Sequence, residues 1–224
     1  MPSSYARILL VAALFVLSAC EPSTPSGTQA SARGTGFDFY VLALSWSPSY
    51  CAAEGENANR QQCNTSRPYG FIVHGLWPQF EKGYPEFCAN DDGRVDRKIE
   101  EEMRTIMPSV GLIRHQWKKH GTCSGLSQQD YFETVAAARD HITIPDVQPD
   151  AGQYRMVSPL EIERAFMKDN PGLDATGVAV TCDQRRLREV RICMTTNLEF
   201  RTCPEVDRRS CRRKQIAMPP QRGR

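Results

Sequence analysis

The spacing of the cysteines is the feature that most constrains what this chain can fold into. The sequence has nine cysteines, one at position 20 and eight spread between Cys51 and Cys211. An even number of cysteines in an exported chain indicates a disulfide framework. Eight cysteines allow roughly a hundred pairings, so the sequence by itself leaves the connectivity open. The closely paired spacings that are typical of zinc sites do not occur, so we expect disulfides instead.

Export is expected from the N-terminal residues. Arg7 precedes an apolar run at 8–17, which is too short to span a membrane as a mature helix. The run ends in Leu17-Ser18-Ala19-Cys20, which resembles the lipobox of a bacterial lipoprotein signal. That resemblance implies that residues 1–19 are removed as a signal peptide, and that lipidated Cys20 anchors the protein in the periplasm, at the outer membrane. The alternative is an ordinary secretory signal, which leaves a soluble, secreted protein.

Composition and charge divide the rest of the chain into three parts. Residues 20–36 are rich in serine, threonine, proline and glycine, which is typical of a flexible tether. Residues 37–211 form the expected single domain, because 224 residues with 40% hydrophobic content can bury one core. From Arg208 to Arg224 there are seven basic residues and no acidic ones, although the net charge of the chain is only +2. We therefore predict a disordered basic tail at 212–224.

Apolar periodicity predicts an α+β domain around one mainly antiparallel sheet. The apolar stretches at 37–46 and 69–77 are typical of buried strands; a turn is expected at 47–51 and a loop from Trp77 onward. Helices are expected where apolar residues recur at helical spacing or follow a capping residue, and two more strands are expected near the C-terminus. The expected helices span 94–107, 128–141 and 159–169, and the late strands span 178–182 and 187–196.

One segment, from His115 to Cys123, combines titratable, hydrogen-bonding and cationic side chains. At about 100° per residue along a helix, Gln116 and His120 share one face. His115 and Lys119 share the neighbouring face. Three interpretations compete: a surface helix with chance histidines, a metal site, and acid–base chemistry on an anion. The metal site fits poorly, because two histidines at this separation point about 140° away from each other.

A second segment upstream decides among these interpretations. It reads Ile72-Val73-His74-Gly75-Leu76-Trp77-Pro78, and the later segment reads His115-Gln116-Trp117-Lys118-Lys119-His120-Gly121-Thr122-Cys123. Together they closely resemble the paired active-site signatures of the ribonuclease T2 family. The resemblance covers about 37–211. It implies a disulfide-stapled α+β fold and an endoribonuclease that cleaves single-stranded RNA with low base specificity and requires no metal or other cofactor.

The resemblance also implies a role for each catalytic residue. His120 is the general base that takes the proton of the ribose 2′-hydroxyl, and His74 is the general acid that protonates the leaving 5′-oxygen. Lys119 stabilises the charge on the phosphorane, and His115 contacts the phosphate. The expected product carries a 2′,3′-cyclic phosphate, which water opens later.

Two positions depart from the family pattern. An acidic residue usually follows the first histidine of the second signature, and Gln116 takes that place here. Because an amide orients its neighbours only by hydrogen bonds, we expect reduced or pH-shifted activity. Trp77 is expected beside the bound base or ribose. Gln79 stands where relatives often carry an acidic residue, so we expect a different base preference.

The resemblance further implies how the cysteines pair. One disulfide ties the loop after the first signature to the end of the second, and two are nested near the C-terminus. The implied pairs are Cys51–Cys63, Cys88–Cys123, Cys182–Cys211 and Cys193–Cys203.

Two functions stay open on the sequence alone. The first is the exported ribonuclease, a monomer whose substrate is single-stranded RNA and which is anchored to the membrane through lipidated Cys20. The second is a lipid-anchored RNA-binding or interaction protein with weak or no catalysis because of Gln116. The basic tail at 212–224 would bind RNA phosphates or anionic lipid, or remain solvated. A secreted zinc hydrolase is a distant third.

Overall fold

The computed structural model describes Met1 and residues 33–66, 68–89, 93–150 and 152–221. Cys20, the rest of the expected signal peptide and the tether as far as residue 32 lie outside the described residues. Within the described ranges, no helix is long and apolar enough to cross a membrane.

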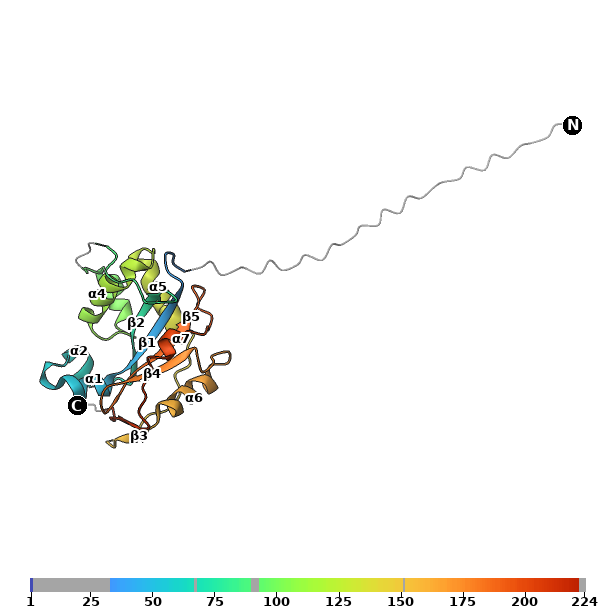
Figure 1. Cartoon of the computed structure of the whole chain (residues 1–224). Helices are drawn as coiled ribbons and strands as arrows, with labels where there is room; N and C mark the ends of the chain where they lie inside the picture. The colour runs from blue at the N-terminus through green and yellow to red at the C-terminus, as the bar shows by residue number, and fades with distance from the viewer. Residues whose placement is uncertain (2–32, 67, 90–92, 151, 222–224) are drawn as a thin grey trace. The chain divides into compact units, whose positions relative to one another are not determined.

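Four antiparallel strands form the central sheet, in the order β2-β1-β5-β4. A smaller sheet pairs β3 with β6. Figure 1 shows the central strands side by side, with α4 and α5 near β2 and α6 near β4. This is the predicted α+β architecture. The strands are β1 Phe39–Trp46, β2 Phe71–Gln79, β3 Arg155–Val157, β4 Val178–Cys182, β5 Leu187–Met194 and β6 Ile216–Met218; the helices are α1 Ser47–Glu54, α2 Arg60–Cys63, α3 Arg97–Met103, α4 Val110–Lys119, α5 Gln128–Asp140, α6 Pro159–Asp169 and α7 Pro204–Asp207, with 3₁₀ turns at Gly55–Asn57 and Gly121–Cys123.

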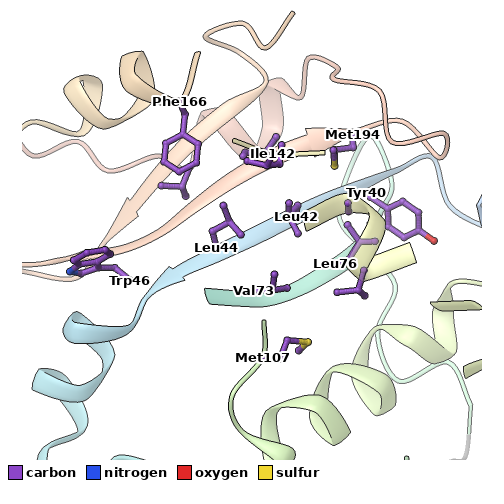
Figure 2. Close-up of a cluster of buried hydrophobic side chains, with 14 of the residues drawn as sticks. Tyr40, Leu42, Leu44, Trp46, Val73, Leu76, Met107, Ile142, Phe166 and Met194 are labelled. Carbon is purple, nitrogen blue, oxygen red and sulfur yellow. The ribbon is translucent and has the colours of Figure 1, made fainter. Parts of the chain in front are cut away.

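One face of the central sheet holds the main hydrophobic core. Leu42 and Leu44 of β1 point to this face, as the period of two in a strand requires, and both are fully buried. Phe166 of α6 and Tyr131 of α5 belong to the same cluster. Figure 2 shows Leu42 and Leu44 in this cluster together with Phe166 and Val73. Burial of each such side chain stabilises the fold by about 1.5–3 kcal/mol.

The opposite face of the sheet carries a much smaller apolar cluster. Phe39 and Val41 of β1 pack there with Ala179 of β4 and Cys193 of β5. This cluster covers only part of the face. The other side chains on this face are therefore available to form a functional site.

A bulge in β2 decides which side chains reach that second face. The register between β1 and β2 skips His74, which has no partner in the ladder. A bulge resets the alternation of a strand, so Val73 and Leu76 both face the core, although they are three positions apart. For the same reason His74 and Trp77 both point to the opposite face, where they line one cleft.

Two local predictions are wrong. The expected turn at 47–51 is the start of α1, because Pro48 occupies the first turn of the helix, where a missing N–H leaves no bond unmade. The loop expected from Trp77 begins later, because β2 continues to Gln79 and includes Pro78. Since β2 is an edge strand, Pro78 needs no donor on its outer side.

Other boundaries follow the predicted signals. Ser127 and Ser158 cap α5 and α6, and each hydroxyl accepts a hydrogen bond from the backbone N–H three residues later. The helix expected at 94–107 is shorter, as α3 covers Arg97–Met103 after its cap, Asp96.

The prediction of a disordered tail at 212–224 is wrong for residues 212–221. Ile216 and Met218 of β6 are fully buried, and the Trp46 indole donates a hydrogen bond to the Pro219 carbonyl at 3.0 Å. Apolar residues two positions apart are the signature of a half-buried strand, and the basic residues before them obscured it. The C-terminal segment is therefore part of the domain.

Four disulfides staple the domain. They join the same pairs that the resemblance implied, Cys51–Cys63, Cys88–Cys123, Cys182–Cys211 and Cys193–Cys203.

Candidate active site

The two signatures meet in a single cleft of about 330 Å³. The bulged strand β2 brings the first signature, the C-terminal end of α4 brings the second, and β5 contributes two charged residues. All seven residues that the sequence singled out for catalysis or substrate binding line this cleft: His74, Trp77, Gln79, His115, Gln116, Lys119 and His120. Glu189 and Arg191 of β5 are among the further residues that line it.

The end of α4 explains how both histidines of the second signature reach the cleft. Ser109 caps the start of the helix, and its hydroxyl accepts a hydrogen bond from Leu112 N–H at 3.3 Å. The helix ends at Lys119, and His120 is the C-cap, with φ −119° and ψ −44°. The His120 N–H still donates to the Gln116 carbonyl at 3.0 Å, and its side chain lines the same cleft as that of His115.

Trp77 is the centre of the cleft. Its indole N–H donates to Gln116 Oε1 at 2.8 Å, and its ring stacks on His120 with centroids 5.4 Å apart. Its edge faces His74 at 5.3 Å, and the guanidinium of Arg191 lies 5.2 Å from its ring centre. One aromatic ring therefore links residues of both signatures and β5.

The hydrogen bond from Trp77 decides how Gln116 can act. Its side chain is buried, and Oε1 is occupied by the indole, so the amide NH₂ group remains to donate to a ligand. Gly75 permits this approach, because a Cβ at that position would lie 2.0 Å from Gln116 Oε1. A larger residue at position 75 would therefore displace the two side chains that form this hydrogen bond.

His120 is held in its neutral form. It is only 5% exposed, and its Nδ1 is buried without a hydrogen-bond partner among the described residues. Burial, followed by the positive charges of Lys119, His115 and His74, lowers the pKa of His120 to about 3. Burial, Lys119 and His74 also lower the pKa of His115.

His74 has a partner on a strand two places away in the sheet. Its Nδ1 lies 2.5 Å from Oε1 of Glu189 on β5. The contact crosses β1, where Ala43 and Ser45 pair with β5 at this level and present only small side chains. Glu189 also accepts two hydrogen bonds from Arg191, at 2.8 and 3.0 Å.

Glu189 is ionised despite its burial. Burial raises the pKa of this carboxyl, but the hydrogen bond and charge of His74, together with Arg191, outweigh it and lower the pKa to about 2. Neither Glu189 nor Arg191 was predicted from the sequence. The signal was present, because the two alternate with buried Val190 and Ile192 in a predicted strand. Charged residues two apart on an apolar strand share a face, and here that face is the cleft.

Lys119 lies at the rim of the cleft. Its ammonium is 3.3 Å from Glu86 and 5.9 Å from the ring centre of Phe87. Phe87 has a positive φ of 53° and donates its N–H to the Lys119 carbonyl at 2.9 Å. The adjacent disulfide, Cys88–Cys123, holds this loop against the end of the second signature.

One side of the cleft is aromatic. Phe80 and Tyr84, 39% and 45% exposed, line it beside Gln79. The Gln79 amide donates to the Pro78 carbonyl at 2.9 Å. Among the described residues, no group of three or more His, Cys, Asp or Glu side chains is placed to hold a metal ion.

Comparison with known proteins identifies what this arrangement is similar to. The model of the ribonuclease T2 family matches residues 37–203. A ribonuclease of Aeromonas hydrophila is 47% identical over 118 residues, and the match covers 53% of this chain and 52% of that protein. The chain thus spans about half the length of this relative.

Two solved structures share the fold. An RNase-related protein from Calystegia sepium has a TM-score of 0.65 at 20% identity, covering 84% of this chain and 100% of that one. RNase NT in complex with 5′-AMP has a TM-score of 0.61 at 24% identity, covering 83% and 100%.

The environment of His120 predicts an unusual titration. In a ¹⁵N-resolved NMR titration, the His120 imidazole should stay neutral until the pH approaches 3. Lys119→Met should raise the pKa, because it removes the nearest positive charge, whereas Lys118→Met, on the exposed side of α4, should change it little. The lowered pKa also makes the free energy of unfolding depend on pH. The contribution of His120 to stability is fully present above pH 6.5, the pKa in the unfolded chain, and it is lost as the pH falls from 6.5 towards 3. A midpoint near 6.5, unmoved by Lys119→Met, would contradict this account.

Proposed function

The chain belongs to the ribonuclease T2 family, and on that premise we propose that it is an endoribonuclease that cleaves single-stranded RNA. The observation that carries the proposal is the convergence of His74, His115, Lys119 and His120 on one cleft from two distant segments of the chain. Three imidazoles and an ammonium around an open cleft suit a substrate with a phosphate at the reacting centre.

The substrate supplies its own nucleophile. In RNA the 2′-hydroxyl lies beside the 3′-phosphodiester, whereas DNA lacks this group and cannot react by the same route. The protein therefore has three tasks: to remove the 2′ proton, to protonate the leaving 5′-oxygen and to stabilise the charge that develops on the phosphoryl oxygens.

His120 is the proposed general base. A base must be unprotonated before the reaction, and burial together with nearby positive charges keeps His120 neutral at neutral pH. A bound phosphate brings negative charge close to Lys119, His115 and His74, and so offsets the charges that lower the pKa of His120. The substrate would thereby raise the basicity of His120 at the moment when a proton must be accepted.

His74 is the proposed general acid. Glu189 engages Nδ1, which leaves Nε2 as the nitrogen that transfers a proton to the 5′-oxygen. Glu189 stays ionised, so its negative charge balances a proton carried by His74. The immediate product is a 2′,3′-cyclic phosphate, and water opens it when the two histidines exchange roles.

Three further side chains would hold the phosphate. Lys119 stabilises the phosphorane charge after exchanging its contact with Glu86 for the substrate, and His115 contacts a phosphate oxygen. Gln116 donates its amide N–H to the same group, because Trp77 already occupies its oxygen. This donor is neutral and independent of pH, unlike the acidic residue usual at this position.

The aromatic side of the cleft supports low base specificity. Phe80 and Tyr84 offer stacking surfaces, and stacking tolerates every base because every base has a π-face. The side-chain amide of Gln79 is engaged by Pro78, so it adds little base readout in the free protein. The complex of RNase NT with 5′-AMP is consistent with a nucleotide site on this fold.

Export supports the same function. Four disulfides persist in an oxidising compartment such as the periplasm or the cell exterior. We propose that the protein is a bacterial periplasmic or secreted monomer, and that Cys20 is lipidated and anchors it to the membrane. The signal peptide rests on the sequence pattern at 7–20, and the anchor on Leu17-Ser18-Ala19-Cys20.

Digestion of single-stranded RNA and matched DNA in the presence of EDTA tests the proposed function. Wild type should release ends with a 2′,3′-cyclic phosphate from RNA only, as read by mass spectrometry. His120→Ala should lower the rate by at least about 10²-fold, because the base is lost. Absence of cleavage by folded wild type between pH 4 and pH 8 would overturn the enzyme and favour the RNA-binding alternative.

Gln116→Glu tests whether the amide is part of the machinery. The carboxyl retains an acceptor for Trp77 and adds a titrating group beside the phosphate, so kcat/KM should rise at acid pH by about tenfold and the pH–rate profile should shift. Gln116→Leu removes both hydrogen-bonding atoms and separates loss of the amide from gain of a carboxylate. If Gln116→Glu matches the parent in both rate and profile, Gln116 has no part in the reaction.

A further inference from the structure

A cluster of basic side chains lies at the turn between β4 and β5. This basic surface consists of two groups that are distant in sequence, the turn and the segment before β6. Its members are Arg185, Arg186, Arg188, Arg212, Arg213 and Lys214.

Covalent and backbone bonds hold the two groups together. The disulfide Cys182–Cys211 joins the end of β4 to the start of the second group. The Cys211 N–H donates to the Val180 carbonyl at 2.7 Å, and the Ala217 N–H donates to the Arg185 carbonyl at 2.8 Å. The basic surface is thus built into the fold and is not a mobile tail.

The positive charge of this surface is largely uncompensated. Arg185, Arg212, Arg213 and Lys214 are exposed and have no ion pair within the described ranges. The carboxylate of Asp183 is shared between Arg186 and Arg188, at 3.8 Å from each. Six cations beside one carboxylate attract a polyanion, although the body of the domain carries no basic excess.

A bulge in β5 connects this surface to the active site. The register between β4 and β5 skips Arg188, so its side chain is released from the alternation of the strand. Arg188 and Glu189 both line a second hollow of about 350 Å³. His74 and Glu189 line this hollow as well as the cleft, so they form the wall between the two.

The position of His74 indicates on which side of the cleft the 3′ part of the RNA strand leaves. The proposed general acid protonates the 5′-oxygen of the leaving nucleotide, so that nucleotide and the strand 3′ of it leave the cleft on the side of His74. That side adjoins the hollow lined by Arg188, which is itself a member of the basic surface. We propose that the basic surface binds backbone phosphates of the RNA strand on the 3′ side of the cleaved bond; the proposal rests on the proposed ribonuclease activity.

Chimeric oligonucleotides with one ribonucleotide in a DNA strand provide the test, because only the ribonucleotide can react. A minimal substrate ends close to the cleaved bond, and two longer ones add about ten deoxynucleotides on either the 3′ or the 5′ side. In wild type the 3′ extension should lower KM at least about tenfold more than the 5′ extension. If three phosphates are engaged, their contribution to affinity falls ~20-fold between about 50 and about 200 mM salt, so the advantage should be clear at about 50 mM and nearly lost at about 200 mM.

A triple variant identifies the residues responsible. Arg212→Gln, Arg213→Gln and Lys214→Gln together should abolish most of the 3′ advantage and leave cleavage of the minimal substrate within about twofold of wild type. The matched control, Arg97→Gln and Lys98→Gln on α3 with Arg104→Gln at its C-cap, removes the same charge from exposed positions that line neither the cleft nor the hollow and should preserve the advantage.

The outcomes separate this proposal from the one on which it rests. Cleavage of the minimal substrate with equal benefit from both extensions in wild type, or a triple variant that keeps the 3′ advantage, would overturn the basic surface as an RNA site while the ribonuclease stands. A triple variant that keeps this advantage but loses binding to phosphatidylglycerol vesicles would assign the surface to membrane lipid instead. No cleavage of any chimera or of RNA would overturn both proposals.

Discussion

The contact between His74 and Glu189 is the constraint on which the site depends. The two side chains come from strands separated by β1, and they meet at 2.5 Å only because the strand between them presents Ala43 and Ser45 at that level. A bulge turns His74 out of the alternation and towards the second face of the sheet, while Leu76 returns to the core. The large apolar face thus fixes the position of a catalytic candidate on the opposite face.

Opposing electrostatic effects set the charge states of two residues in the cleft. Burial and surrounding positive charge keep His120 neutral, whereas Glu189 is ionised beside His74. Trp77 separates the two imidazoles and also holds Gln116 by its oxygen. If His120 is the base and His74 the acid, as we propose, the two lie on either side of one ring, and a bound phosphate would balance the positive charge around them.

Local signals in the sequence predicted most of the fold and much of the site. The capping serines of α5 and α6, the apolar strands and the two signatures all led to the observed elements, because each depends on residues close in sequence. The bulge at His74 and the partnership with Glu189 depend on strand order, which periodicity does not reveal. Likewise β6 was missed, because Ile216 and Met218 become a strand only by pairing with β3 and packing in the core.

Glu189→Gln tests most directly the central claim that a carboxylate across the sheet positions the general acid. Two substrates should be compared across pH: a dinucleotide, whose 5′-oxygen needs a proton to leave, and a nucleoside 3′-nitrophenyl phosphate, whose leaving group needs none. The account predicts that the substitution slows the dinucleotide by about 10²-fold and the nitrophenyl substrate by less than about threefold, and that it changes the pH profile only of the dinucleotide. Equal losses on both substrates would show that Glu189 supports the fold or substrate binding and does not position the acid.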